Sequence, residues 1–154
     1  MSILRSNKGK SELEIELIPT FDYAHERGWE GKVRVSGSFW DGDHDRPVGS
    51  EMEGLWIHAE TLRMMQKHLK SWISLPLSEL GNAVLQGEFE LARIPGQKFL
   101  LVFGEREDTI NSGHPVVSIE LQVGSSHQVK AHFVTDQSCL RLFVEELKLE
   151  TILK

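Results

Sequence analysis

Apolar and polar side chains alternate along several short segments of the chain, which is the period-2 pattern of a half-buried β-strand. In the segment ELEIELI, Leu13, Ile15 and Leu17 alternate with glutamates, and the strand is expected to end at Pro19. The segment WEGKVRVSGSFW alternates in the same way over residues 29–40. A third, shorter strand is predicted near EGLWI, after the turn-rich connection DGDHDRPVGS. Residues 1–11 are polar apart from a short SIL stretch and are expected to fray.

A helical pattern follows, and then a second group of alternating segments. An apolar stripe with helical spacing begins after residue 59 and predicts a helix that ends before Pro76. Four further strands are predicted around residues 85–91, 99–103, 117–123 and 129–133, with turns at Pro95-Gly96 and at Gly124-Ser125-Ser126. The side chains of Thr135 and Asp136 are expected to cap a final helix. The apolar stripes of the two helices consist of Leu62, Met65, Leu69 and Trp72, and of Leu140, Phe143, Val144 and Leu147.

The order of these elements, βββ-α-ββββ-α, predicts an α+β fold. We expect one mainly antiparallel sheet of about six to seven strands, with both helices packed on one face of it, because each helix has one apolar stripe. A length of 154 residues without a linker or repeat indicates a single domain over residues 1–154.

Composition and charge narrow the class of partner. The formal net charge of −6 argues against nucleic acid as the main partner and is compatible with a basic one. The single cysteine, Cys139, excludes an intramolecular disulfide. The sequence contains no apolar run of the length of a membrane span and no recognisable signal peptide, so we expect a cytoplasmic protein without a membrane partner.

The most distinctive local feature is an acidic loop with aspartates at every second position. Asp41, Asp43 and Asp45 offer three carboxylates in a short segment, so they are a candidate calcium site. The sixth and twelfth positions of a calcium-binding loop would hold Arg46 and Met52 rather than glycine and glutamate. A solvated hairpin loop is therefore the favoured interpretation, and no bound cofactor is predicted.

Other chemistry-bearing residues do not form a recognisable catalytic pattern. No two of the seven histidines have the spacing that places two metal ligands on one face of a strand or helix. Nucleophile-elbow and phosphate-binding glycine motifs are missing, so no catalytic residue is predicted. Cys139 lies near the start of the last helix, where the helix dipole can lower a thiol's pKa, but a buried, inert thiol is the favoured reading. The glutamates at positions 12, 14 and 16 are expected to form the solvated face of a strand.

A tryptophan precedes the acidic loop. The alternation of its strand places Trp40 on the face opposite Trp29. A core role would be ordinary for Trp40, but exposed tryptophans often mark interfaces. The hypothesis is therefore that a contact patch for a basic partner consists of Trp40, Asp41, Asp43, His44 and Asp45.

The closing segment HFVTDQSCLRLFVEELKLE combines a strand end with an aromatic residue, a Thr-Asp-Gln cap and an amphipathic helix. Together with Leu13-Glu14-Ile15, Gly28-Trp29 and the helix over residues 62–69, this segment resembles the WapI-type small bacterial proteins. Many of these are uncharacterised or are proposed to be toxin immunity proteins. The matching positions are core and capping residues, so the resemblance implies a fold and carries over no functional residue.

The leading hypothesis is thus a non-enzymatic intracellular binding module, immunity-like, that docks onto a partner protein. One alternative is a small-molecule-binding or metal-assisted hydrolytic domain, with its pocket on the sheet face opposite the helices. Another is a homodimeric structural protein paired through a sheet edge or a tryptophan patch.

Overall fold

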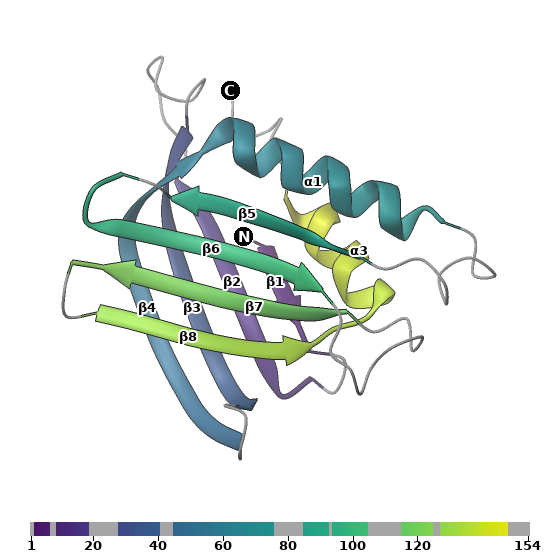
Figure 1. Cartoon of the computed structure of the whole chain (residues 1–154), viewed down its shortest axis with the longest axis horizontal. Helices are drawn as coiled ribbons and strands as arrows, with labels where there is room; N and C mark the ends of the chain where they lie inside the picture. The colour runs from purple at the N-terminus through teal and green to yellow at the C-terminus, as the bar shows by residue number, and fades with distance from the viewer. Residues whose placement is uncertain are drawn as a thin grey trace.

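In the part of the chain that it describes, a computed structural model shows two four-stranded antiparallel sheets and two helices (Figure 1). The structure describes residues 2–6, 9–18, 28–40, 45–75, 85–92, 94–104, 115–124 and 127–147. The first sheet has neighbouring strands in chain order: β1 (Ser2–Arg5), β2 (Ser11–Ile18), β3 (Gly28–Trp40) and β4 (Asp45–His58). The second sheet is ordered in the same way: β5 (Gly87–Ala92), β6 (Gln97–Gly104), β7 (Val116–Val123) and β8 (His127–Val134). Helix α1 (Ala59–Ile73) connects the two sheets, and α3 (Gln137–Glu146) follows β8.

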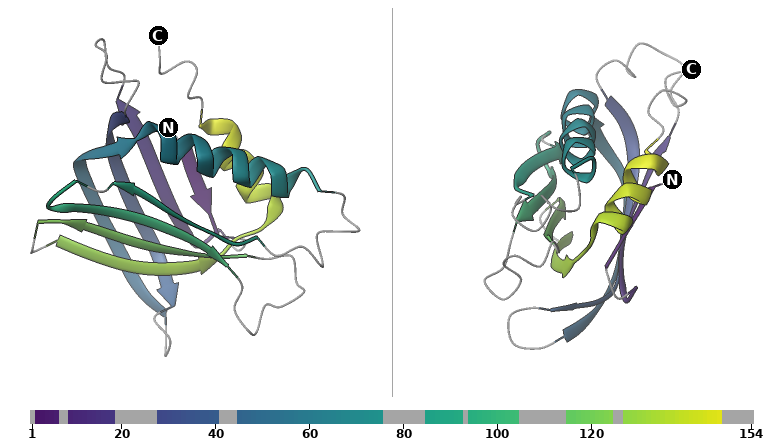
Figure 2. Two further views of the ribbon diagram at one scale, coloured as in Figure 1. Left: turned by 45° about the horizontal axis from the view of Figure 1, so that its top comes forward. Right: turned by 90° about the vertical axis from the view of Figure 1, so that its right-hand side faces the viewer.

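The predicted alternation gives each sheet one apolar face, and the two faces meet in a single core. Strand β2 buries every second residue, as expected from Leu13, Ile15 and Leu17. Figure 2 shows the sheets as two layers with the helices at one side. The largest fully buried side chains come from both sheets and both helices: Trp29, Ile57, Phe99, Phe103, Leu62, Met65 and Phe143.

The α+β class with antiparallel strands is confirmed, but the prediction of one sheet is wrong. Alternation identifies which side chains are apolar and says nothing about what covers them. In the structure, the apolar faces of the first and second groups of strands cover each other, and the helices complete the core. The two described helices, of 15 and 10 residues, offer too little apolar surface to cover the eight described strands on one face.

Two expectations about the first sheet also need correction. Residues 2–5 form strand β1 instead of fraying, and Leu4 is fully buried in the core. Strand β4 begins at Asp45, so six of the ten residues in the expected turn-rich connection DGDHDRPVGS are strand. Pro47 and Gly49 suggested a turn, but β4 is an edge strand, where a residue without a backbone N–H is tolerated.

The two helices lie against each other and close one side of the sandwich. Helix α1 packs beside β5 and reaches β3 and β4, whereas α3 packs against β1. Side-chain amides join the helices, since Gln137 donates to the carbonyl oxygen of Ile73 at 2.8 Å and Gln66 donates to that of Leu147 at 2.8 Å. No helix in the described part of the chain is long and apolar enough to span a membrane.

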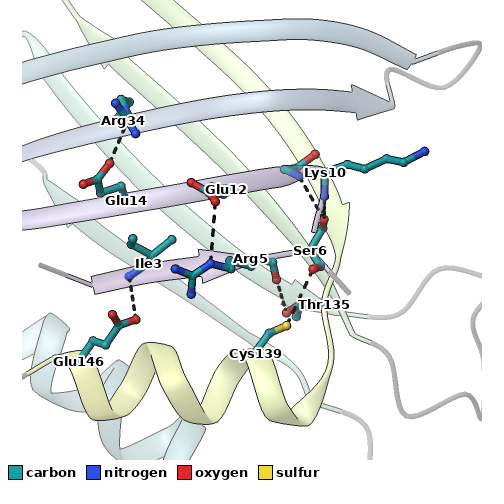
Figure 3. A network of polar contacts seen from close by, with 11 residues as sticks. Ile3, Arg5, Ser6, Lys10, Glu12, Glu14, Arg34, Thr135, Cys139 and Glu146 are labelled. Carbon is teal, nitrogen blue, oxygen red and sulfur yellow. Dashed lines mark hydrogen bonds and ion pairs between the residues drawn. The ribbon is translucent and has the colours of Figure 1, made fainter. Parts of the chain in front are cut away.

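Helix α3 begins where the sequence predicts and covers the exposed edge of β1. Asp136 is its N-cap, with Oδ1 accepting a hydrogen bond from the backbone N–H of Cys139 at 2.8 Å. The hydroxyl of Thr135 donates to the carbonyl oxygen of Arg5 at 2.9 Å, and the carboxylate of Glu146 accepts from the N–H of Ile3 at 3.3 Å (Figure 3). These contacts occupy backbone groups of an edge strand that would otherwise be open to pairing.

A glutamine side chain closes part of the other edge of the first sheet. Gln97, the first residue of β6, accepts a hydrogen bond from the N–H of Trp56 at 3.0 Å and donates one to the carbonyl oxygen of Gly54 at 2.8 Å. Its amide thus bonds β4 as the backbone of a neighbouring strand would. This pair of bonds ties the second sheet to the first.

Candidate partner-binding arm

The candidate site lies on an arm formed by the ends of β3 and β4. Strand β2 pairs with β3 only as far as Gly37, which lies opposite Ser11. Beyond that point β3 pairs with β4 alone, through Ser38↔Pro47, Phe39↔Arg46 and Trp40↔Asp45. Three residue pairs extend the hairpin by about 10 Å at 3.3 Å per residue. Figures 1 and 2 show these strand ends projecting past β8, beyond the second sheet.

Gly37 occupies the base of this arm for a steric reason. Its φ of +122° lies in a region that residues with a side chain rarely adopt. A Cβ atom there would overlap the carbonyl oxygen of Lys10 and lie 2.6 Å from the Cα of Ser11. The close approach of β2 and the unusual φ therefore both require glycine where β3 leaves its neighbour.

The structure places part of the predicted contact patch and leaves the rest undescribed. Trp40 and Asp45 form the last residue pair of the hairpin, so they share the outer end of the arm. Asp41, Asp43 and His44 lie outside the described residues, as do the side chains of Trp40 and Asp45. The prediction that Asp45 belongs to the loop is wrong, because it is the first residue of β4.

The side chains of the candidate calcium site, Asp41, Asp43 and Asp45, consequently fall outside what the structure describes. Within the described ranges, no group of three or more histidine, cysteine, aspartate or glutamate side chains is placed to hold a metal ion.

Two of the other three tryptophans belong to the interior. Trp29 is fully buried and Trp72 is 6% exposed, whereas Trp56 is half-buried. The guanidinium of Arg63 lies over the ring of Trp29, 5.6 Å from its centroid. These three tryptophans therefore do not form an exposed contact patch.

The outer face of the first sheet carries an ion-pair lattice where the row of glutamates was expected. Glu14 pairs with Arg34 at 3.1 Å across β2 and β3, and Lys32 pairs with Glu51 at 2.6 Å across β3 and β4. Glu12 pairs with Arg5 at 3.8 Å (Figure 3). The expectation that this row faces away from the core is confirmed.

The second sheet has a shallow groove on its outer face. The groove measures about 330 Å³, and its polar groups include the Glu120 carboxylate, which lies 3.1 Å from the ammonium of Lys98. Its lining combines Leu100 and Val102 with Ser118, Glu120, Lys130 and His132. This is the sheet face on which a small-molecule pocket was expected as an alternative, and whether a ligand binds there stays a prediction.

The thiol of Cys139 lies in the first turn of α3 and is partly buried. Its Sγ atom lies 3.8 Å from the carbonyl oxygen of Ser6 (Figure 3). Burial raises the pKa of the thiol, and the carboxylate of Asp136 raises this pKa further. The N-terminal position in a helix therefore does not make this thiol a ready nucleophile.

We expect the alkylation of Cys139 by iodoacetamide to be slow in the folded protein. The thiolate is the reacting form, so the rate should rise at a higher pH in the folded protein than in urea. Because the pKa of the Cys139 thiol is higher in the folded protein than in the unfolded chain, the thiol stabilises the fold at pH values below the unfolded pKa. This stabilisation is lost as the pH rises through the folded pKa. Because the chain has one cysteine, rate–pH profiles of the folded and unfolded protein measure this directly. If the alkylation rate of the folded protein rose at the same pH as that of the unfolded protein, or at a lower pH, this result would contradict the raised pKa.

Sequence reasoning did not identify the arm or the contacts that hold the fold around it. No local sequence pattern shows that the pairing of β2 with β3 stops three residues before β3 ends. A glycine in the middle of a strand, however, is a sign of a bulge or of a close approach by another backbone. Gly37 is such a residue.

Comparison of the chain with protein-family models, with curated proteins and with solved structures finds no match.

Proposed function

We propose that this chain is a non-enzymatic binding module that docks onto a basic partner protein through the β3–β4 arm, in the manner of an immunity protein. The observation that carries the proposal is the register of the hairpin. Three residue pairs extend beyond β2 and place both ends of the acidic loop, Trp40 and Asp45, at the outer end of the arm. A projecting hairpin presents its tip to a partner without disturbing the core.

The chemistry of the tip supports a basic partner. The segment from Trp40 to Asp45 contains three aspartates and one histidine. Carboxylates on a projecting element attract a positively charged surface over several ångströms and increase the rate of association. The adjacent tryptophan is the residue type that contributes most at the centre of interfaces. The resemblance of the last strand and helix to WapI-type proteins is consistent with this proposal.

The test replaces Asp41, Asp43 and Asp45 together by asparagine. The tagged protein and this variant are used to capture partners from a lysate of the host, at low and high salt, followed by mass spectrometry. We expect one stoichiometric partner that the unchanged protein retains at low salt. With that partner purified, the association rate should fall by roughly tenfold in the variant, and its salt dependence should flatten.

A matched control removes three negative charges elsewhere. Glu53, Glu88 and Glu90 are exposed on the strands, and their replacement by glutamine changes the net charge by the same amount. Association that is equally slow in both variants would indicate a general charge effect and contradict the arm. Recovery of the chain itself as the sole partner would favour the homodimer instead.

A further inference from the structure

Positive charges are segregated between the sheets and the helices. Every lysine or arginine with a described side chain on a strand lies within 4.0 Å of a glutamate carboxylate. The shortest of these pairs are Lys32–Glu51 at 2.6 Å, Arg34–Glu14 at 3.1 Å and Lys98–Glu120 at 3.1 Å. Among the strands, positive charge is thus locally neutralised.

The helices differ from the strands in this respect. Arg63, Lys67 and Lys70 of α1 and Arg141 of α3 are all exposed. None of these four forms an ion pair within the described part of the chain. Helix α1 carries one glutamate, Glu60, against its three cations, whereas α3 carries Glu145 and Glu146 beside Arg141. Positive charge is therefore in excess along α1. Within the residues that the structure describes, a protein with a net charge of −6 therefore has a positively charged surface along α1.

The spacing of the α1 residues places them in one stripe. Positions 63, 67 and 70 are related as i, i+4 and i+7, which lie on one side of a helix over about 10 Å. They line a groove of about 470 Å³ together with Gln66, Ser71 and Ser74, which offer hydrogen-bonding groups. Arg141 joins the C-terminal end of the stripe, because its guanidinium donates to the carbonyl oxygen of Ile73 at 3.3 Å.

Two of the four cations are held in place by contacts that leave their charge unneutralised. Arg63 is positioned over the ring of Trp29, and Arg141 is positioned by the end of α1. Side chains that are already ordered lose less conformational entropy when a ligand binds. Lys70 in the last turn also interacts favourably with the helix dipole, but this explanation does not extend to Arg63 or Lys67.

We propose that the surface formed by Arg63, Lys67, Lys70 and Arg141 binds an acidic segment of a partner protein. The stripe spans only about two turns, which matches two or three carboxylates on one face of a helix. A nucleic acid would continue beyond it, past Glu60 and Glu145 and over a molecule of net negative charge. This helix surface is separate from the arm and opposite to it in charge.

The test uses a fluorescein-labelled helical peptide with glutamates at positions i, i+4 and i+7, and the same peptide with glutamines. Binding is measured by fluorescence anisotropy at about 0.15 M salt, where the screening length is about 8 Å. The variant replaces Arg63, Lys67 and Lys70 by glutamine. The control replaces Lys32, Lys98 and Lys130 by glutamine, so both proteins lose three positive charges.

We expect the glutamate peptide to bind the unchanged protein and the control equally, and to bind the helix variant at least tenfold more weakly. Amide shifts in an NMR titration should lie on α1 and α3. Should the helix variant lose helical circular dichroism, the single change Lys67→Glu gives the same comparison, because no other described residue depends on that ammonium. Equal weakening in both variants, absence of binding, or tighter binding of single-stranded DNA would each overturn the proposal.

Discussion

Replacing Gly37 by alanine is expected to cause one of the largest losses of stability available from a single methyl group in this protein. A non-glycine residue in a rarely populated φ region costs about 1–3 kcal/mol. The added Cβ would also overlap the carbonyl oxygen of Lys10, which belongs to the backbone and cannot rotate away. We therefore expect a loss of at least about 3 kcal/mol, measured by urea denaturation.

Gly49 provides the matched control on the same hairpin. It lies in β4 opposite Ser36, one residue pair from Gly37, and no atom lies within 4 Å of the position that its Cβ would occupy. Gly49→Ala should change the free energy of unfolding by no more than about 0.5 kcal/mol. If the two variants were equally stable, β3 would not approach β2 at Gly37 as the structure has it, and the base of the arm would need revision.

The local features of this fold were predictable because they depend on neighbouring residues. Alternation identified Leu13 and Ile15 as inward-facing, and Asp136 was expected to cap α3 because capping involves only the first turn of a helix. The same local reasoning failed for β4. Pro47 is a turn former in isolation, and only its position on an edge strand makes it compatible with a sheet.

The arrangement of the sheets was not predictable from such patterns. The bonds from Gln97 to β4 and from Thr135 to Arg5 join residues 41 or more positions apart, and neither glutamine nor threonine signals such a role in sequence. Strand β1 owes its order to long-range contacts of this kind, because four residues alone do not make a stable strand. The polar composition of residues 1–11 favoured fraying, but contacts with distant residues hold Ser2–Arg5 in a strand.

The candidate site shows the same division. Sequence reasoning selected the segment from Trp40 to Asp45 by its composition, whereas the register of β3 with β2 and β4 determines that the ends of this segment project. The positive helix surface is the reverse case. The apolar stripe of α1 indicates that Arg63, Lys67 and Lys70 face away from the core. Only the structure shows that the described cations on the strands pair with glutamates, whereas those on the helices do not.

Removal of the Phe143 side chain is expected to detach α3 from the core. Phe143 is fully buried in the face of α3 that packs on the protein. Truncation of a buried phenylalanine to alanine costs about 3–5 kcal/mol. For a chain of this length, the melting temperature should fall by roughly 6–20 °C at 2–4 °C per kcal/mol. Circular dichroism during thermal unfolding measures both the helix content and this shift.

Leu142 is the matched control, because it is the preceding residue of α3 and is 51% exposed. Leu142→Ala should change the free energy of unfolding by about 0.5 kcal/mol or less. The two variants should also differ in self-association. Loosening α3 removes the Thr135 and Glu146 contacts from β1 and opens its edge to pairing, so light scattering should detect oligomers of Phe143→Ala alone. A monomeric Phe143→Ala variant as stable as Leu142→Ala would show that α3 neither completes the core nor protects the edge of β1.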